Sequence, residues 1–310
     1  MKAKVQSAAI LAVLVAFAGV SFAEPHSHHP RKDVPVSTPT LTAEINMNLE
    51  LQNKTALVTG STAGIGLAIA TSLAREEATV IINGRTKKRV NDAIKQIRSQ
   101  YSDARLEPLV ADVSESSAVA STIRQFPKVD ILINNVGIGE LKPFEKISDN
   151  DWSKLIETNF MSGVRLSRFY LPLMKKQDWG RIIFISSESG VNIPSNMIHY
   201  GVTKTMQIAL ARGLAETTAG TAVTVNSIVV GPTSTEGVNK FLANLAKKTN
   251  VSIAEIQTNF FKTERPGSLL QRFAKAEEVA NLVLYYSSPL SSGTNGAAIR
   301  VDGGVVRSIL

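Results

Sequence analysis

The sequence predicts an α/β protein, with a doubly wound parallel sheet and helices on both of its faces. Short apolar runs rich in β-branched residues alternate with stretches of helical spacing from about residue 50 onwards. A glycine-rich turn joins the first of these runs to the first helical stretch. Strands that alternate with helices require right-handed crossovers and therefore a parallel sheet. Such a sheet binds ligands beyond the carboxyl ends of its strands.

The expected elements follow one another along the chain. Apolar runs predict strands at 55–60, 79–84, 106–112, 129–135, 181–186 and 223–230. Helical periodicity predicts helices that include 65–76, 87–100 and 201–217. From 236 to 268 the alternation stops, and two short amphipathic helices are expected at 241–250 and 256–267. The whole of 49–310 is expected to form a single domain.

The first 48 residues are expected to lie outside this domain. Residues 1–23 combine two lysines, an apolar run and a small-residue end, which is the pattern of a secretory signal peptide cleaved after Ala23. Residues 24–48 are rich in His, Pro, Ser and Thr, as in a flexible linker. We therefore expect a periplasmic or secreted protein with no membrane attachment after cleavage. Translation from Met47 would instead give a cytoplasmic protein, and the N-terminus of the protein in its native cell separates the two.

Composition excludes several kinds of chemistry. The chain has no cysteine, so disulfides, thiolate catalysis and cysteine-ligated metals are ruled out. His26, His28 and His29 have no further ligand at regular spacing, and no metal site is expected. The formal net charge is +8, but the basic residues are scattered and no arginine-rich arm or aromatic stripe accompanies them. We expect no nucleic-acid partner. The densest basic cluster, at 85–89, fits a local anionic ligand.

The turn TGSTAGIG predicts a phosphate-binding loop. Gly60, Gly64 and Gly66 stand directly between the first strand and the first helix. Glycine lets the backbone turn sharply and approach a pyrophosphate, while the new helix points its free N–H groups and its positive dipole end at the anion. A glycine triplet alone is weak evidence, but the strand before it and the helix after it supply the required context.

The stretch SESGVNIPSNMIHYGVTK predicts proton-transfer chemistry. Tyr200 stands four residues before Lys204, so both lie on one helical face, and Ser187 ends the preceding strand run. An ammonium nearby is expected to lower the pKa of the phenol so that it exchanges a proton with an alcohol or carbonyl. Ser187 is placed to hydrogen-bond the same oxygen. Ser186 is the alternative serine, and His199 is expected to line the pocket or pack.

The ordered motifs resemble the short-chain dehydrogenase/reductase family along almost all of the chain from about residue 50. The loop has the family's TGxxxGxG spacing, and Asn134–Gly137 is similar to its NNAG segment with Val136 in place of alanine. Trp152 and Asn159 resemble its central-helix signature, and 301–304 its last strand. Val230 stands where the family has the proline of its PG motif.

The resemblance implies a Rossmann fold with seven parallel strands and an NAD(P)-dependent oxidoreductase that acts on CH–OH or C=O groups. The catalytic set that it implies is Asn159, Ser187, Tyr200 and Lys204, with Asn159 keeping a water for the proton relay. The implied cofactor-binding residues are Gly60, Ser61, Thr62, Gly64, Ile65, Gly66, Asp112, Val113, Asn135, Val136, Gly137, Tyr200, Lys204, Gly231, Thr233 and Thr235. The segment 236–268 stands where the family carries its substrate lid, and its phenylalanines suggest an apolar or mixed pocket.

The end of the second strand favours NADP(H) over NAD(H). NAD-selective folds of this kind place an acidic residue there for the ribose 2′-hydroxyl. This chain has Gly84 and then Arg85, so nothing repels a 2′-phosphate and a guanidinium is placed to bind it. Lys87 and Lys88 add positive charge.

Three functions remain open from the sequence. The first is an NADP(H)-dependent enzyme acting on a secondary alcohol or ketone, with Tyr200 as the general acid and base. The second is a cofactor-binding protein of the same fold without catalysis, and the third is an exported interaction protein that uses its His-rich arm. The family resemblance also implies a homodimer or homotetramer. The physiological substrate and the direction of reaction are not determined by these motifs.

Overall fold

The computed structural model describes residues 48–309. The expected signal peptide and all but the last residue of the expected linker lie outside the described residues. A parallel seven-stranded sheet runs in the order β3-β2-β1-β4-β5-β6-β9. This confirms the predicted fold class. No helix in the described part of the chain is long and apolar enough to cross a membrane.

The strands are short, and the central ones are fully buried. Their bounds are β1 Thr55–Val58, β2 Thr79–Gly84, β3 Leu106–Val110, β4 Ile131–Asn134, β5 Gly180–Ser187, β6 Val223–Val230 and β9 Ala298–Val301. A separate two-stranded pair joins β7 (Thr233–Ser234) to β8 (Ala274–Lys275). The strand order reverses between β1 and β4, which is the point where ligands bind in open sheets of this kind.

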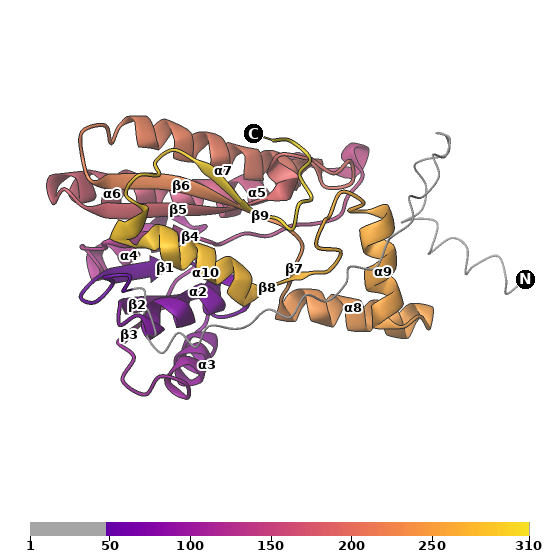
Figure 1. Ribbon diagram of the computed structural model, residues 1–310, viewed down its shortest axis with the longest axis horizontal. Coiled ribbons are helices and arrows are strands. Elements are labelled where there is room, and N and C mark those ends of the chain that lie inside the picture. Colours follow the sequence, from indigo (N-terminus) through magenta and orange to yellow (C-terminus); the bar gives the residue numbers. More distant parts are fainter. Residues whose placement is uncertain (1–47, 310) are drawn as a thin grey trace, which may run out of the picture. The chain divides into compact units, whose positions relative to one another are not determined.

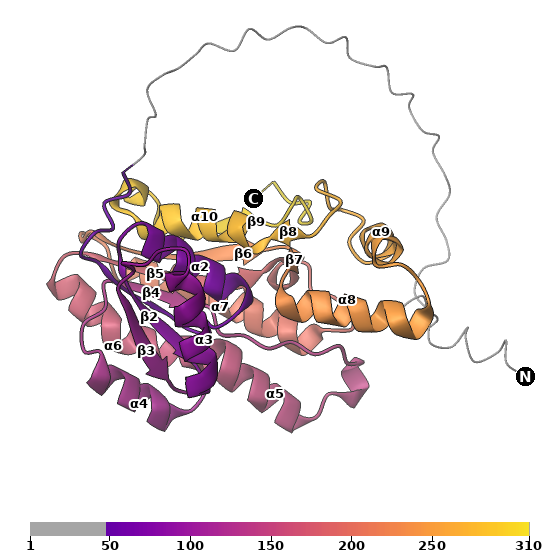
Figure 2. The ribbon, with the colours of Figure 1, turned by 90° about the horizontal axis from the view of Figure 1, so that it is seen from below.

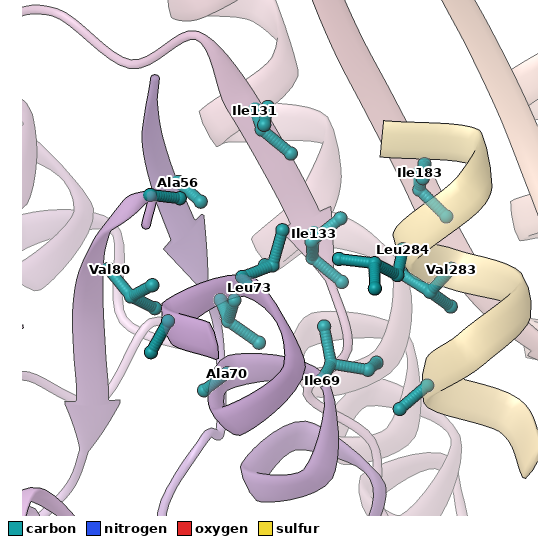
Figure 3. Packing of buried hydrophobic residues seen from close by; sticks show 14 of the residues in the cluster. Ala56, Ile69, Ala70, Leu73, Val80, Ile131, Ile133, Ile183, Val283 and Leu284 are labelled. Atoms are coloured by element: carbon teal, nitrogen blue, oxygen red, sulfur yellow. The ribbon is translucent and has the colours of Figure 1, made fainter. Parts of the chain in front are cut away.

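Helices cover both faces of the sheet. One face carries α2 (Gly64–Arg75), α3 (Lys87–Arg98) and α10 (Ala276–Ser287), and the other carries α4 (Ser116–Gln125), α6 (Ser162–Lys176) and α7 (Ile198–Glu216). Figures 1 and 2 show these two layers on opposite sides of the strands. In Figure 3, Ile69 and Leu73 of α2 and Val283 and Leu284 of α10 point toward β4 and β5. Apolar side chains spaced for one helical face therefore form each layer's contact with the sheet.

The two helices in the segment after β6 begin earlier than the periodicity predicts. α8 spans Glu236–Thr249 and α9 spans Ile253–Thr263, and both lie to the right of the sheet in Figures 1 and 2. The side chain of Thr235 caps α8 by accepting a hydrogen bond from Val238 N at 3.3 Å, and Ser252 caps α9 in the same way. These caps set the two starts, whereas the apolar residues used for the prediction begin later in each helix.

Candidate active site

The glycine loop between β1 and α2 has a backbone path that only glycine adopts easily, and it leads into an uncapped helix N-terminus. Gly60 and Gly64 have φ of +65° and +56°, a region that favours glycine. A Cβ at Gly66 would lie 2.5 Å from both Asn135 Nδ2 and Gly60 O. Ala63, the N-cap of α2, has no side-chain oxygen and provides no cap, and the first turn has no acidic residue. The free N–H groups of that turn are therefore available to an anion such as a pyrophosphate.

Hydrogen bonds from two neighbouring strands fix the loop. Asn83 Oδ1 accepts from Gly60 N at 3.0 Å, and Ser61 Oγ accepts from Asn83 N at 2.9 Å. Thr59 Oγ1 accepts from the backbone N of Asn135 and Val136 at 2.9 and 3.1 Å. The segment after β4 is thus fastened to the loop after β1. Thr59 and Asn83 were not among the predicted site residues, and only their positions at strand ends could have indicated them.

The end of β2 has no room for an acidic side chain. A Cβ at Gly84 would lie 2.5 Å from Thr62 Cγ2, so the adjacent loop residue fills the space that a carboxylate would need. Arg85 is exposed, as are Lys87 and Lys88, and Lys88 pairs with Asp92 on its own helix at 2.6 Å. Arg85 forms no ion pair with any described residue. Its guanidinium is therefore available to a phosphate at this edge.

The remaining predicted cofactor residues lie along the same strand ends. Asp112 accepts hydrogen bonds from Ser114 N and Ser114 Oγ, at 3.1 and 2.7 Å, and Val113 is buried in the core. Thr235 lies against Gly64, whose added Cβ would be 3.3 Å from its side chain. Thr233 Oγ1 donates to Gly231 O at 2.9 Å. Ile65 is half-buried at the start of α2.

Ser187, Tyr200 and Lys204 come together at the carboxyl end of β5. The side chain of Ser187 lies close enough to the Tyr200 hydroxyl to affect its pKa. Ser186 instead donates to Lys204 O at 2.8 Å and faces away from this pair, so the spacing argument for Ser187 agrees with the geometry. Lys204 Nζ donates to Ile185 O at 2.9 Å and lies 5.6 Å from the centre of the Tyr200 ring. A Cβ at Gly137 would be 3.2 Å from the same Nζ.

Burial shifts the two titrating groups in opposite directions. It raises the pKa of Tyr200; the hydrogen bond from Ser187 and the charge of Arg265 act against this, and the charge of Glu188 adds to it. Burial lowers the pKa of Lys204 to about 8. The expected lowering of the Tyr200 pKa by the lysine is therefore wrong for the protein without cofactor. The ammonium is directed to Ile185 O and to Gln207 Oε1, and desolvation of the phenolate dominates.

Asn159 lies in a π-helical turn, Ile156–Met161, between α5 (Asp149–Leu155) and α6. It is buried, and its side chain exchanges two hydrogen bonds with the backbone of Ile138, at 2.8 and 2.9 Å. The backbone carbonyl of Asn159 accepts from Gln207 Nε2 at 2.6 Å, while Gln207 Oε1 accepts from Lys204 Nζ at 3.2 Å. The side chain of Gln207 thus bridges the backbone of Asn159 and the amine of Lys204. π-turns of this kind are frequent at functional sites.

Sequence reasoning missed three polar residues around the site: Gln207, Glu188 and Arg265. Gln207 stands three residues after Lys204 on the same helical face, and this spacing could have revealed it. Glu188 follows Ser187 directly, and Arg265 reaches it from the segment after α9. His199 is fully buried edge-on to Trp152, with both nitrogens lacking hydrogen-bond partners in the described residues, so it packs and does not line the pocket.

No group of three metal-ligating side chains occurs within residues 48–309.

Comparison with known proteins gives one consistent result. The family model of short chain dehydrogenases matches residues 54–246. YvaG, an uncharacterised oxidoreductase of Bacillus subtilis, is 48% identical over 263 residues, which cover 85% of this chain and 100% of YvaG. The 3-oxoacyl-acyl-carrier-protein reductase FabG of Aquifex aeolicus is 34% identical, covering 84% and 100%. The crystal structure of L-sorbose reductase from Gluconobacter frateurii with NADPH and L-sorbose aligns with a TM-score of 0.79 at 28% identity, covering 85% and 100%.

Proposed function

Because the chain belongs to the short-chain dehydrogenase/reductase family of NAD(P)-dependent oxidoreductases, we propose that it transfers a hydride between NADP(H) and a secondary alcohol or ketone. The observation that carries this proposal is the convergence of Ser187, Tyr200 and the buried Lys204 at the carboxyl end of β5, with Lys204 Nζ 5.6 Å from the centre of the Tyr200 ring. A phenol and a hydroxyl that converge on one point can both bond a carbonyl oxygen placed there.

The residues divide the chemistry between them. Ser187 holds the substrate oxygen, and Tyr200 donates its proton to that oxygen in reduction or removes it in oxidation. When bound, NADP(H) supplies or accepts the hydride at the substrate carbon. Lys204 Nζ lies 5.6 Å from the centre of the Tyr200 ring, and Gln207 and Ile185 O hold it in place. Asn159 anchors the turn between α5 and α6 on the loop after β4.

The electrostatics indicate the protonation states at neutral pH. Burial raises the pKa of Tyr200, so the phenol is protonated at neutral pH, which is the form that donates a proton in reduction. Below about pH 8 Lys204 is an ammonium, and this charge is lost as the pH rises through the pKa of Lys204.

Three observations support NADP(H) as the cofactor. The glycine loop has backbone space that a Cβ at Gly66 would fill, as a close approach to a pyrophosphate requires. Thr62 occupies the space of an acidic side chain at Gly84, and Arg85 lies exposed beside it. The sorbose reductase that aligns with this chain was solved with NADPH. Gly60–Gly66 would hold the pyrophosphate and Arg85 the 2′-phosphate.

Replacement of Tyr200 by phenylalanine tests the assignment. Tyr200→Phe removes the proton donor and keeps the ring against Gly139, so we expect kcat to fall by about a thousandfold or more while the dissociation constant for NADPH stays within about twofold. NADPH oxidation on a panel of ketones and fluorescence titration with NADPH measure the two quantities. Turnover at the wild-type rate by the purified variant would refute the catalytic role of Tyr200.

A further inference from the structure

A buried ion pair joins the segment after α9 to the residue that follows the catalytic serine. Glu188 Oε1 accepts from Arg265 Nε at 2.8 Å and from Ser189 Oγ at 3.1 Å. The exposed fractions of the two charged side chains are only 5% for Glu188 and 15% for Arg265. In contrast, the Arg272–Glu278 and Arg75–Glu76 pairs lie at the surface. A largely buried ion pair therefore joins the lid segment to the residue after Ser187.

This pair has unused hydrogen-bonding capacity on both partners. Glu188 Oε2 is buried and has no partner among the described residues. Arg265 uses Nε for Glu188 and Nη1 for Glu264 O, and Nη2 donates to no described residue. A buried acceptor left without a donor costs about 1–3 kcal/mol, and more when it is charged. Such a cost is commonly retained where the group has a ligand to bind.

The pair lies next to the reacting groups. Ser187 and Glu188 are consecutive, so their Cα atoms are about 3.8 Å apart. The charges of Glu188 and Arg265 both act on the Tyr200 hydroxyl, with opposite signs. A substrate group held by the pair would therefore lie near the carbonyl held by Ser187 and Tyr200.

We propose that Glu188 and Arg265 bind a hydroxyl group of the substrate, so that the preferred substrates are ketones with a hydroxyl on a neighbouring carbon. A hydroxyl can donate to Oε2 and accept from Nη2 at once, which a simple ketone cannot do. The opposite charges of the pair cancel, and this favours a neutral hydroxyl over a carboxylate. Phe260 and Phe261 of the lid and Phe273 beyond it are in mutual contact beside Arg265. The inference rests on the proposed carbonyl reduction.

Matched substrate pairs test the proposal. We would measure kcat/KM with NADPH for 3-hydroxy-2-butanone against 2-butanone, and for dihydroxyacetone against acetone, with pyruvate as the anionic probe. We expect the wild-type protein to favour the hydroxylated member of each pair by at least about tenfold, because a simple ketone leaves the buried groups unpaired. In Glu188→Met/Arg265→Met the ratio should fall to about 1, since removing both partners leaves no uncompensated buried charge.

Two further variants keep the result interpretable. Arg75→Met/Glu76→Met removes the same two charges from a surface pair and should keep the wild-type ratio. If the buried double variant fails to bind NADPH, and so has not folded, Arg265→Lys serves in its place. The lysine keeps the positive charge but lacks the planar guanidinium and its several N–H donors, and the ratio should fall several-fold.

The possible outcomes separate the inference from the function on which it rests. Equal wild-type rates for both members of each pair, or an unchanged ratio in the double variant, would overturn hydroxyl recognition and leave carbonyl reduction standing. Preference for pyruvate would overturn it in favour of anion recognition. A wild-type protein that binds NADPH but reduces none of these carbonyls would count against both proposals.

Discussion

Lys204 is a buried cation, and its replacement by methionine should change stability by an amount that depends on pH and should make the protein catalytically inactive. Burial lowers the pKa of Lys204 from its ordinary value of 10.5 to about 8. That difference corresponds to roughly 3 kcal/mol against folding when the amine is charged. Since the folded pKa lies below the unfolded one, the penalty is fully present below about pH 8. It disappears as the pH rises toward the unfolded value, because the unfolded chain binds more protons in that window.

The hydrogen bonds of the amine set the opposing contribution. Lys204→Met loses the bonds to Ile185 O and Gln207 Oε1, each of which contributes about 1.5–3 kcal/mol while the amine is charged. These losses offset the relief of the burial penalty at pH 7, whereas at pH 10 most of that penalty has already gone. The stability of the variant relative to wild type should therefore fall by about 2 kcal/mol between pH 7 and pH 10, and a packing effect alone would not depend on pH.

Urea denaturation of the full chain without cofactor, at pH 7 and pH 10, measures this difference. Lys248→Met, at an exposed position of α8, controls for the loss of one positive charge. NADPH oxidation at pH 7 should show that Lys204→Met has lost at least about a hundredfold in turnover. The reasoning would be refuted by a variant that is less stable than wild type by the same amount at both pH values.

Three further predictions concern the cofactor and self-association. Arg85→Ala should weaken NADPH binding by about 10- to 100-fold and NADH binding by less than about twofold, as the two dissociation constants would show. Equal losses would place Arg85 away from the 2′-phosphate. Gly66→Ala should weaken both cofactors by at least about tenfold because its Cβ meets Asn135 and Gly60 O at 2.5 Å, whereas Gly213→Ala, with nothing within 4 Å, should leave both unchanged. Light scattering at micromolar concentration should give a dimer or tetramer, and a monomeric mass would contradict that expectation.

The sheet and the path of the glycine loop could be predicted because they depend on local patterns. β-branched runs bounded by turn residues mark buried strands, and the glycine spacing requires a particular backbone path. The start of α7 at Ile198 could not be predicted, because its N-cap, Met197, has no side-chain cap and leaves no signal. No sequence pattern predicted the π-turn at 156–161 either. Asn159, within this turn, is held by long-range hydrogen bonds to Ile138 and Gln207.

Long-range contacts account for what the sequence did not reveal at the site. Glu188 and Arg265 are 77 residues apart, and only the folded lid brings them together. The small residues of α7 show the same limit. Ala211 and Ala215 pack in the protein's own core, whereas Ala209 and Gly213 are exposed and so remain available to a partner helix. The sequence shows where small residues occur on the helix, but it does not show what packs against each of them.

Burial of charge distinguishes the site from the ion pairs at the surface. At the surface, Asp151 and Glu278 accept hydrogen bonds from cations and backbone, which lower the pKa of each carboxyl and favour its charged form. At the carboxyl end of β5 the opposite holds, because burial raises the pKa of Tyr200 and lowers that of Lys204. Each shift disfavours the charged form that proton transfer requires, so the fold bears a cost there that its surface ion pairs do not. Groups that are held in unfavourable environments by a rigid sheet end are typical of sites selected for chemistry at the expense of stability.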